Sequence, residues 1–235
     1  MRIVGIVQAL HRFPVKSMAA ESLQTVSAGW HGFAGNRRWA FVRPGMERSG
    51  FPWLTIREKP DLWRHEAYFT DPADVESSKT MVRTPDGSEW EVTDPELAQR
   101  LGEGVRVIKV GSGIFDIFPL SLLTVQSVAE LSELVGQTLT PLRFRPNLVI
   151  NASEGDPFPE ERWEGAVLRI GGLRCRLDMR DPRCMMVNID PVETTSTNPA
   201  VLRAIAQKRD AHFGMYGTVV KPGEVSVGDS VSIED

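Results

Sequence analysis

Short stretches of alternating or β-rich apolar residues dominate the chain. They recur at residues 2–10, 38–43, 89–92, 105–110, 148–151, 167–170, 173–179 and 185–189. Alternation of apolar and polar positions is typical of strands that bury one face, and short apolar bursts are typical of fully buried strands. The pattern therefore predicts a chain made mostly of strands and turns.

Helical signals are fewer. A short helix is predicted over 94–102, where proline stands at the first helical position and glycine at the end. A second helix is predicted near Ser127 and Glu130, whose spacing is that of a capping box. A third helix fits residues 198–208, which have an apolar inner face. Helices are therefore expected to be accessory to the strands.

The last part of the chain has the pattern of strands joined by tight turns. Apolar segments at 217–220, 224–227 and 230–233 are separated by Lys-Pro-Gly and Gly-Asp. Such an ending closes many β-barrels. If the chain has two units, the boundary falls near Phe118.

Composition and charge narrow the function classes. The chain has 235 residues, of which 41% are hydrophobic and 25% charged, as in folded globular proteins. Its net charge of -4 argues against a general nucleic-acid binder. No apolar run approaches the roughly 18 residues of a membrane helix. The apolar start lacks a cleavage pattern and continues into His11 and Arg12, so we expect a cytoplasmic protein without a membrane span.

The chain has two cysteines, which exclude a disulfide framework and an iron–sulfur cluster held by this chain alone. Alternation places Cys175 on the apolar face of its strand with Leu173 and Leu177. Cys184 follows that strand, and its neighbour Arg183 is cationic. A partly exposed thiol beside an arginine can serve as a nucleophile or a metal ligand. The alternative for Cys184 is a small buried apolar residue.

Two common cysteine sites fit poorly. A cysteine protease needs a histidine base, and no protease signature surrounds His11, His31, His65 or His212. A zinc site is weaker still, because the two cysteines are nine residues apart rather than at ligand spacing.

Cationic side chains also gather in segments of turn character. Arg143 and Arg145 flank an aromatic residue before a strand, and we expect Pro146 to hold Arg145 extended. Lys16 and Ser17 follow a proline at the end of the first strand. Each cluster could bind an oxyanion, but taken singly each is better explained by a structural alternative, such as a solvated edge strand with salt bridges for Arg143 and Arg145.

Seven short motifs follow one another along the chain. They are Pro14-Val15-Lys16-Ser17, Gly35-Asn36-Arg37-Arg38-Trp39, Arg57-Glu58-Lys59-Pro60-Asp61-Leu62, Phe144-Arg145-Pro146-Asn147, Arg183-Cys184, Phe213-Gly214-Met215-Tyr216 and Gly223-Glu224-Val225-Ser226-Val227-Gly228-Asp229. Their combination and order resemble the MOSC family with its N-terminal β-barrel partner domain. The resemblance covers nearly the whole chain. It implies an α+β, mostly β fold in which an N-terminal β-barrel-like domain (1–118) packs on a C-terminal MOSC barrel (119–235) with a few peripheral helices.

The resemblance also implies roles for individual residues. Cys184 matches the cysteine that binds molybdenum and is the expected catalytic residue. Arg183 flanks it as a further candidate for cofactor binding. The positions expected to hold the pterin and its phosphate are Lys16, Ser17, Arg37, Arg145 and Asn147. Asn36 departs from the family pattern, because many relatives have aspartate there, and this puts the orientation of Arg37 in question.

The implied activity is that of a molybdenum-dependent oxidoreductase. It would bind molybdenum cofactor (Mo-molybdopterin) and reduce N-hydroxylated or N-oxygenated small molecules by oxygen-atom transfer. Without an iron–sulfur cluster, it would take electrons from a separate ferredoxin, flavoprotein or cytochrome. The alternative is a carrier that delivers the cofactor, or sulfur held on Cys184 as a persulfide, because one fold can host both functions.

Overall fold

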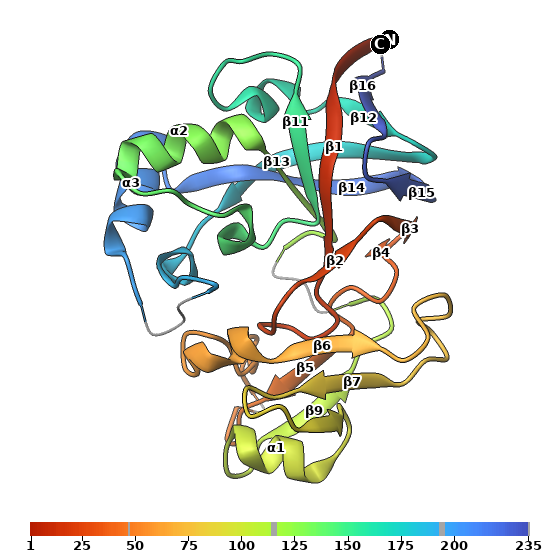
Figure 1. Ribbon diagram of the computed structural model, residues 1–235, viewed down its shortest axis with the longest axis vertical. Coiled ribbons are helices and arrows are strands. Elements are labelled where there is room, and N and C mark those ends of the chain that lie inside the picture. The colour runs from red at the N-terminus through yellow and green to blue at the C-terminus, as the bar shows by residue number, and fades with distance from the viewer. Residues whose placement is uncertain (47, 114–116, 193–195, 235) are drawn as a thin grey trace.

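The computed structural model describes residues 1–46, 48–113, 117–192 and 196–234. Figure 1 shows two layers stacked along the long axis, with the two chain ends side by side at one pole. The layer with the chain ends contains a closed barrel, and the other contains small sheets, a 3₁₀ helix and a short α-helix. The chain is mostly β, as the sequence predicts.

Seven strands form the barrel. In order around it they are β11 (Leu148–Ala152), β10 (Leu120–Thr124), β14 (His212–Lys221), β13 (Leu173–Pro182), β12 (Val167–Ile170), β16 (Ser230–Ile233) and β1 (Arg2–Arg12). Pairing of β1 with β11 closes the ring, and only β10 and β11 run parallel. Apolar side chains such as Leu10, Ile150 and Leu177 fill the interior. Closure satisfies the strand edges that an open sheet would leave exposed.

Strand β1 joins the two halves of the chain. It pairs with β16, where Arg2 lies opposite Ile233, and with β11 on its other side. The predicted boundary after residue 118 falls between β9 (Arg106–Lys109) and β10 in the sequence. The barrel thus takes one strand from before that boundary, and the division into 1–118 and 119–235 stays a prediction.

The second layer has its own apolar core. Strands β5 (Trp39–Val42) and β9 form one ribbon, and β6 (Glu66–Phe69), β7 (Thr80–Arg83) and β8 (Glu89–Glu91) form an antiparallel sheet. The 3₁₀ helix η1 (Pro60–Arg64) and helix α1 (Pro95–Leu101) complete the layer. Phe41, Trp63 and Leu97 pack together in its interior. Helix α1 matches the helix predicted over 94–102.

Short strands complete the region next to the barrel. Strand β2 (Glu21–Leu23) pairs with β1, while β3 (Thr25–Gly29), β4 (Gly32–Phe33) and β15 (Gly223–Ser226) form a separate sheet. Val225 of this sheet is fully buried against the barrel core. This sheet therefore extends the apolar core that the barrel begins.

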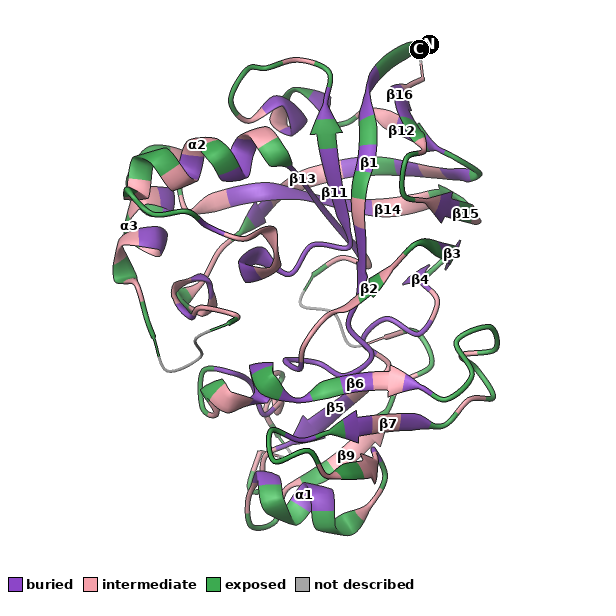
Figure 2. Ribbon diagram, in the orientation of Figure 1, coloured by how far each residue is buried: buried purple, intermediate pink, exposed green. Residues whose placement is uncertain are grey.

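Two helices cover one side of the barrel. Helices α2 (Val125–Val135) and α3 (Pro199–Arg209) turn Leu131, Val201 and Ile205 toward it, and Figure 2 shows their inner faces buried. Helix α2 begins before the capping box predicted at Ser127. Thr124 is its N-cap and accepts a hydrogen bond from the Ser127 backbone N–H at 3.2 Å.

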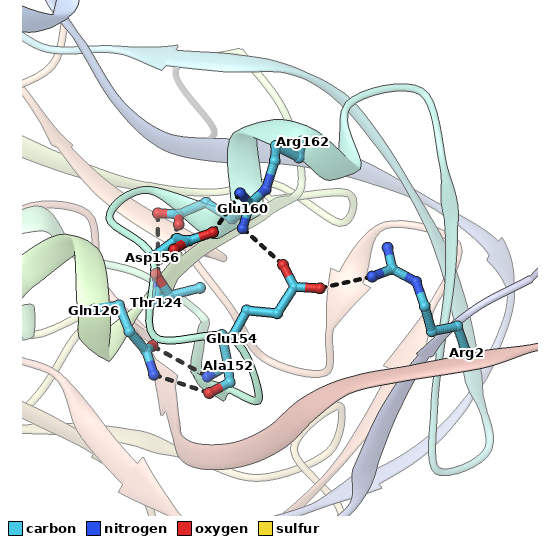
Figure 3. A network of polar contacts seen from close by, with 8 residues as sticks. All are labelled: Arg2, Thr124, Gln126, Ala152, Glu154, Asp156, Glu160 and Arg162. Atoms are coloured by element: carbon cyan, nitrogen blue, oxygen red, sulfur yellow. Dashed lines mark hydrogen bonds and ion pairs between the residues drawn. The ribbon is translucent and has the colours of Figure 1, made fainter.

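A buried carboxyl group supports the start of α2 (Figure 3). Glu160, in the 3₁₀ helix η3 (Pro159–Trp163), accepts a hydrogen bond from the Thr124 hydroxyl at 2.7 Å. It accepts a second one from the Ser127 hydroxyl at 2.6 Å. Gln126 pairs with the backbone of Ala152 in β11. These contacts fix α2 to the barrel wall.

One predicted strand is wrong. Residues 185–189 do not form a strand, because Met185–Asn188 is a 3₁₀ helix, η4. The Val187 carbonyl accepts a hydrogen bond from Arg143 rather than from a neighbouring strand. A short apolar run is compatible with either structure, and here the tertiary hydrogen bonds decide. Arg143 itself belongs to another 3₁₀ helix, η2 (Pro141–Phe144).

Candidate functional site

One pocket brings most of the predicted site residues together. Lys16, Ser17, Arg37, Arg145, Arg183 and Cys184 all line it. The pocket contains about 650 Å³ of space outside the protein atoms, part of which is open solvent. The lining comes from both halves of the chain, so the pocket exists only in the folded whole.

Lys16, Ser17 and Arg37 lie on two adjacent backbone segments. The Lys16 N–H donates to the Trp39 carbonyl at 2.8 Å, and the Arg37 N–H donates to the Phe13 carbonyl at 2.6 Å. Ser17 and Arg37 have φ angles of 69° and 51°, in the left-handed region that side chains seldom adopt. Such strain persists where the surrounding structure fixes it, and it clusters at functional sites.

Asn36 stabilises the same pair of segments. Its side-chain oxygen accepts a hydrogen bond from the Phe13 backbone N–H at 3.0 Å, and the residue is buried. Asn36 therefore helps to orient the backbone that carries Arg37.

Arg145 is held between the two layers. Its guanidinium lies 4.1 Å from the centre of the Phe13 ring and 4.3 Å from that of Trp63, and it donates to the Met18 carbonyl at 2.8 Å. The expectation that Pro146 keeps Arg145 extended is wrong. Its φ and ψ are 54° and 46°, because it ends η2 in a left-handed turn.

Asn147 lies outside the group of residues that line the pocket. Its side-chain amide donates to the His11 carbonyl at 3.0 Å, and its side-chain oxygen accepts from the Ser121 backbone N–H at 3.3 Å. The residue is 1% exposed. In this structure Asn147 connects three barrel strands beneath the pocket residues Ser121 and Arg145.

Cys184 is half-buried and contacts an arginine from the other layer. The Arg57 guanidinium lies 3.1 Å from Sγ of Cys184. A tight turn holds Arg57, because Thr55 accepts from the Arg57 N–H at 3.2 Å and donates to Glu58 at 2.7 Å. Arg57 occurs in one of the seven motifs, but sequence reasoning gave it no role. The two residues are 127 positions apart, so no local sequence pattern indicates their contact.

Arg183 is directed away from the sulfur of its neighbour. It donates to the carbonyls of Phe213 at 2.7 Å and Phe144 at 2.8 Å and pairs with Asp181 at 2.8 Å. The positive charge in contact with the thiol thus comes from Arg57, whereas Arg183 fixes the loop that presents Cys184.

Sequence reasoning missed four further polar residues of the pocket. Thr55, Ser121, Asp181 and Tyr216 line it together with Cys184. Burial raises the pKa of Asp181 to about 6, although Arg183 opposes this shift. A signal for Asp181 was present in the sequence, because it continues the alternation of Leu173, Cys175 and Leu177.

The other titratable candidates lie elsewhere. Cys175 is 1% exposed in the barrel core, as predicted, and burial raises its pKa to about 12. No histidine is among the described residues of the pocket. In the part of the chain that the structure describes, no three His, Cys, Asp or Glu side chains gather as a metal site.

The closed barrel, the accessory layer and a thiol-containing pocket lined from both halves of the chain define a two-part β-barrel protein. The MOSC domain matches residues 115–232, and the MOSC N-terminal beta barrel domain matches residues 4–110. The chain belongs to the MOSC family.

Curated relatives share about half of this chain. Mitochondrial amidoxime reducing component 2 of Macaca fascicularis is 29% identical over 128 residues, which are 49% of this chain and 37% of that protein. Mitochondrial amidoxime-reducing component 1 of Danio rerio is 28% identical over 124 residues, again 49% and 37% of the two chains. The matched segment thus spans little more than a third of either relative.

A solved structure shares the whole fold. The YUAD protein of Bacillus subtilis superposes with a TM-score of 0.55 at 13% identity, covering 98% of this chain and 96% of its own. At that identity the likeness concerns the fold alone. In the described residues, no helix is long and apolar enough to cross a membrane.

Proposed function

We propose that this chain binds molybdenum cofactor through Cys184 and reduces N-hydroxylated or N-oxygenated small molecules. The observation that carries the proposal is the convergence of Lys16, Ser17, Arg37, Arg145, Arg183 and Cys184 on one pocket. These residues come from four separate segments of the chain. The names of the curated relatives, which are amidoxime reducing components, support the choice of substrate class.

The side chains present fit such a cofactor. Cys184 supplies a soft sulfur ligand, which suits a thiophilic metal whose other sulfur donors come from the pterin. Lys16 and Arg37 supply positive charge and hydrogen-bond donors for a phosphate. Phe51, Phe144 and Met186 give the pocket apolar walls that restrict water around a bound pterin or substrate.

Arg57, Arg183 and Asn147 contribute by positioning other groups of the site. When bound, the cofactor supplies two-electron chemistry in which an oxygen atom leaves the substrate. Arg57 holds the Cys184 sulfur toward the pocket, and Arg183 fixes the loop behind it. Electrons come from a separate electron-transfer protein in this proposal. Asn147 holds β10, which carries Ser121, to β1 through its hydrogen bonds to Ser121 and His11.

Metal and pterin analysis tests the cofactor. Protein produced in a host that makes molybdenum cofactor is expected to hold close to one molybdenum and one pterin per chain. Cys184→Ala is expected to lose the metal. Cys175→Ala is the matched control and keeps it, because Cys175 lies in the barrel core. Wild-type protein without pterin or molybdenum would refute the proposal.

Turnover separates the reductase from the carrier. With reduced methyl viologen and benzamidoxime, the molybdenum-loaded protein is expected to release benzamidine, whereas a carrier would not. A persulfide on Cys184 in protein that lacks turnover would favour sulfur transfer. A persulfide anion on Cys184 would also be partly shielded from solvent and in contact with the Arg57 guanidinium. This contact is the observation that favours the sulfur-carrier alternative.

A further inference from the structure

Asp181 is a buried acid in the wall of the pocket. It is 2% exposed, and its carboxylate accepts a hydrogen bond from the Ser121 hydroxyl at 3.2 Å and pairs with Arg183 at 2.8 Å. The Tyr216 side chain also hydrogen-bonds to it. Among the described residues that line the pocket, Asp181 is the only one with a carboxyl group.

The barrel itself does not require an acid at this place. Asp181 follows the inward-facing Leu173, Cys175 and Leu177 of β13, where an apolar residue would pack without desolvating a charge. Replacing both partners of a buried ion pair, here Asp181 and Arg183, by apolar residues is often neutral or stabilising. The cost of keeping a carboxyl group there points to a chemical task in the pocket.

We propose that Asp181 is a catalytic residue that donates a proton to the substrate as its N–O bond breaks. This inference rests on the proposed reductase function. Reduction of an amidoxime breaks the N–O bond, consumes two electrons from the external donor and two protons, and yields an amidine and water. One proton goes to nitrogen and one to oxygen. Asp181 supplies one of them and regains it from solvent.

The surroundings of Asp181 suit a proton donor that works near neutral pH. Burial raises the pKa of its carboxyl group to about 6, and Arg183, which follows the strand, opposes the shift. Tyr216 from β14 and Ser121 from β10 lower the pKa through hydrogen bonds, as Arg37 does through its charge. A general acid is most effective when its pKa lies near the working pH.

The first test uses the cofactor-free protein. With ¹³C-labelled aspartate, one carboxyl resonance is expected to titrate with a midpoint near 6, and Asp181→Asn should remove it. Ser121→Ala should move this midpoint upward, because it deletes a hydrogen bond to the carboxylate. If every aspartate titrated near its ordinary value, the proposal would be overturned.

The second test measures kcat/KM for benzamidoxime per bound molybdenum between pH 5 and 8.5. Wild-type activity is expected to fall about tenfold per pH unit above the midpoint, and Asp181→Asn should lose roughly 10²-fold or more with a flat profile. Asp181→Glu should keep the fall in activity at high pH. In Ser121→Ala the pH at which activity falls should move upward, as the midpoint of the carboxyl resonance does. Asp178→Asn is the matched control, because Asp178 on the same strand contacts Thr218 outside the pocket lining.

The outcomes separate the two proposals. Loaded wild-type protein without turnover would overturn both the reductase and the role of Asp181. Turnover with the same falling limb in Asp181→Asn would overturn only the assignment of the proton donor. A limb that disappears in Asp181→Asn and moves in Ser121→Ala supports it.

Discussion

Arg145 links the two layers of the molecule through a single side chain. Its planar guanidinium is stacked between Phe13 and Trp63 while it donates to the Met18 carbonyl. Guanidinium groups stack on aromatic faces in a way that an ammonium group cannot reproduce. The strained backbone at Arg145 therefore serves an interaction that holds the pocket segments together.

Replacing Arg145 by lysine is expected to lower the free energy of unfolding by about 1–2 kcal/mol, because a desolvated stacked cation is worth roughly that much. Urea denaturation measures the change. Arg64→Lys, at an exposed position of η1, is the control and should leave stability unchanged. Equal stability of the two variants would contradict the stacking argument.

The two cysteines should differ in reactivity. Cys184 is half-buried in the pocket, whereas burial both shields Cys175 and raises the pKa of its thiol to about 12. A disulfide reagent at pH 7.5 is expected to label one thiol in the folded cofactor-free protein and two after unfolding. Cys184→Ala should abolish the native labelling, and rapid modification of Cys175 instead would show that the barrel core opens.

At the scale of elements, the start of helix α2 depends on a buried acid from η3. Glu160 is fully buried, and this burial raises its pKa above the ordinary value, although the Ser127 and Thr124 hydroxyls oppose the shift. An acid with a raised pKa binds its proton more tightly in the folded state than in the unfolded state. Its stabilising contribution is therefore present at acidic pH and is lost as pH rises through the folded pKa.

Glu160→Gln should remove this pH dependence. The stability of the wild type relative to Glu160→Gln is expected to fall between pH 5 and pH 8, as measured by urea unfolding at both values. Glu164→Gln, at an exposed position after η3, is the control and should show no such trend. A difference that grows toward pH 8 would mean that Glu160 is stabilised as an anion.

At the scale of the whole molecule, one barrel is built from both ends of the chain. Strand β1 fills the gap between β11 and β16, and the two termini lie side by side in Figure 1. A fragment without β1 leaves two strand edges unpaired, and such edges promote aggregation.

The fragment 119–235 alone is expected to aggregate. Appending residues 1–12 to its C-terminus through a short linker should improve its solubility, because Arg2 pairs with Ile233 and the new hairpin restores the native register. Size-exclusion chromatography and circular dichroism compare the two fragments. A folded, monomeric 119–235 would show that β1 is dispensable for the barrel.

The sequence by itself determined the local structure and much of the site. Alternation and capping signals located most barrel strands and all three α-helices, because these patterns reflect which faces are buried. The ordered motifs indicated the family and identified six residues that line the pocket. Cys175 in the core followed from strand periodicity alone.

Only the tertiary structure decided which distant groups meet. Arg57 contacts Cys184 across the two layers, Arg145 adopts a left-handed conformation, and Met185–Asn188 forms a 3₁₀ helix instead of a strand. Each outcome depends on partners far away in the sequence, such as Trp63 for Arg145. Local conformational propensity is weak compared with burial and hydrogen bonding. These features therefore depend on long-range contacts, which local sequence patterns do not reveal.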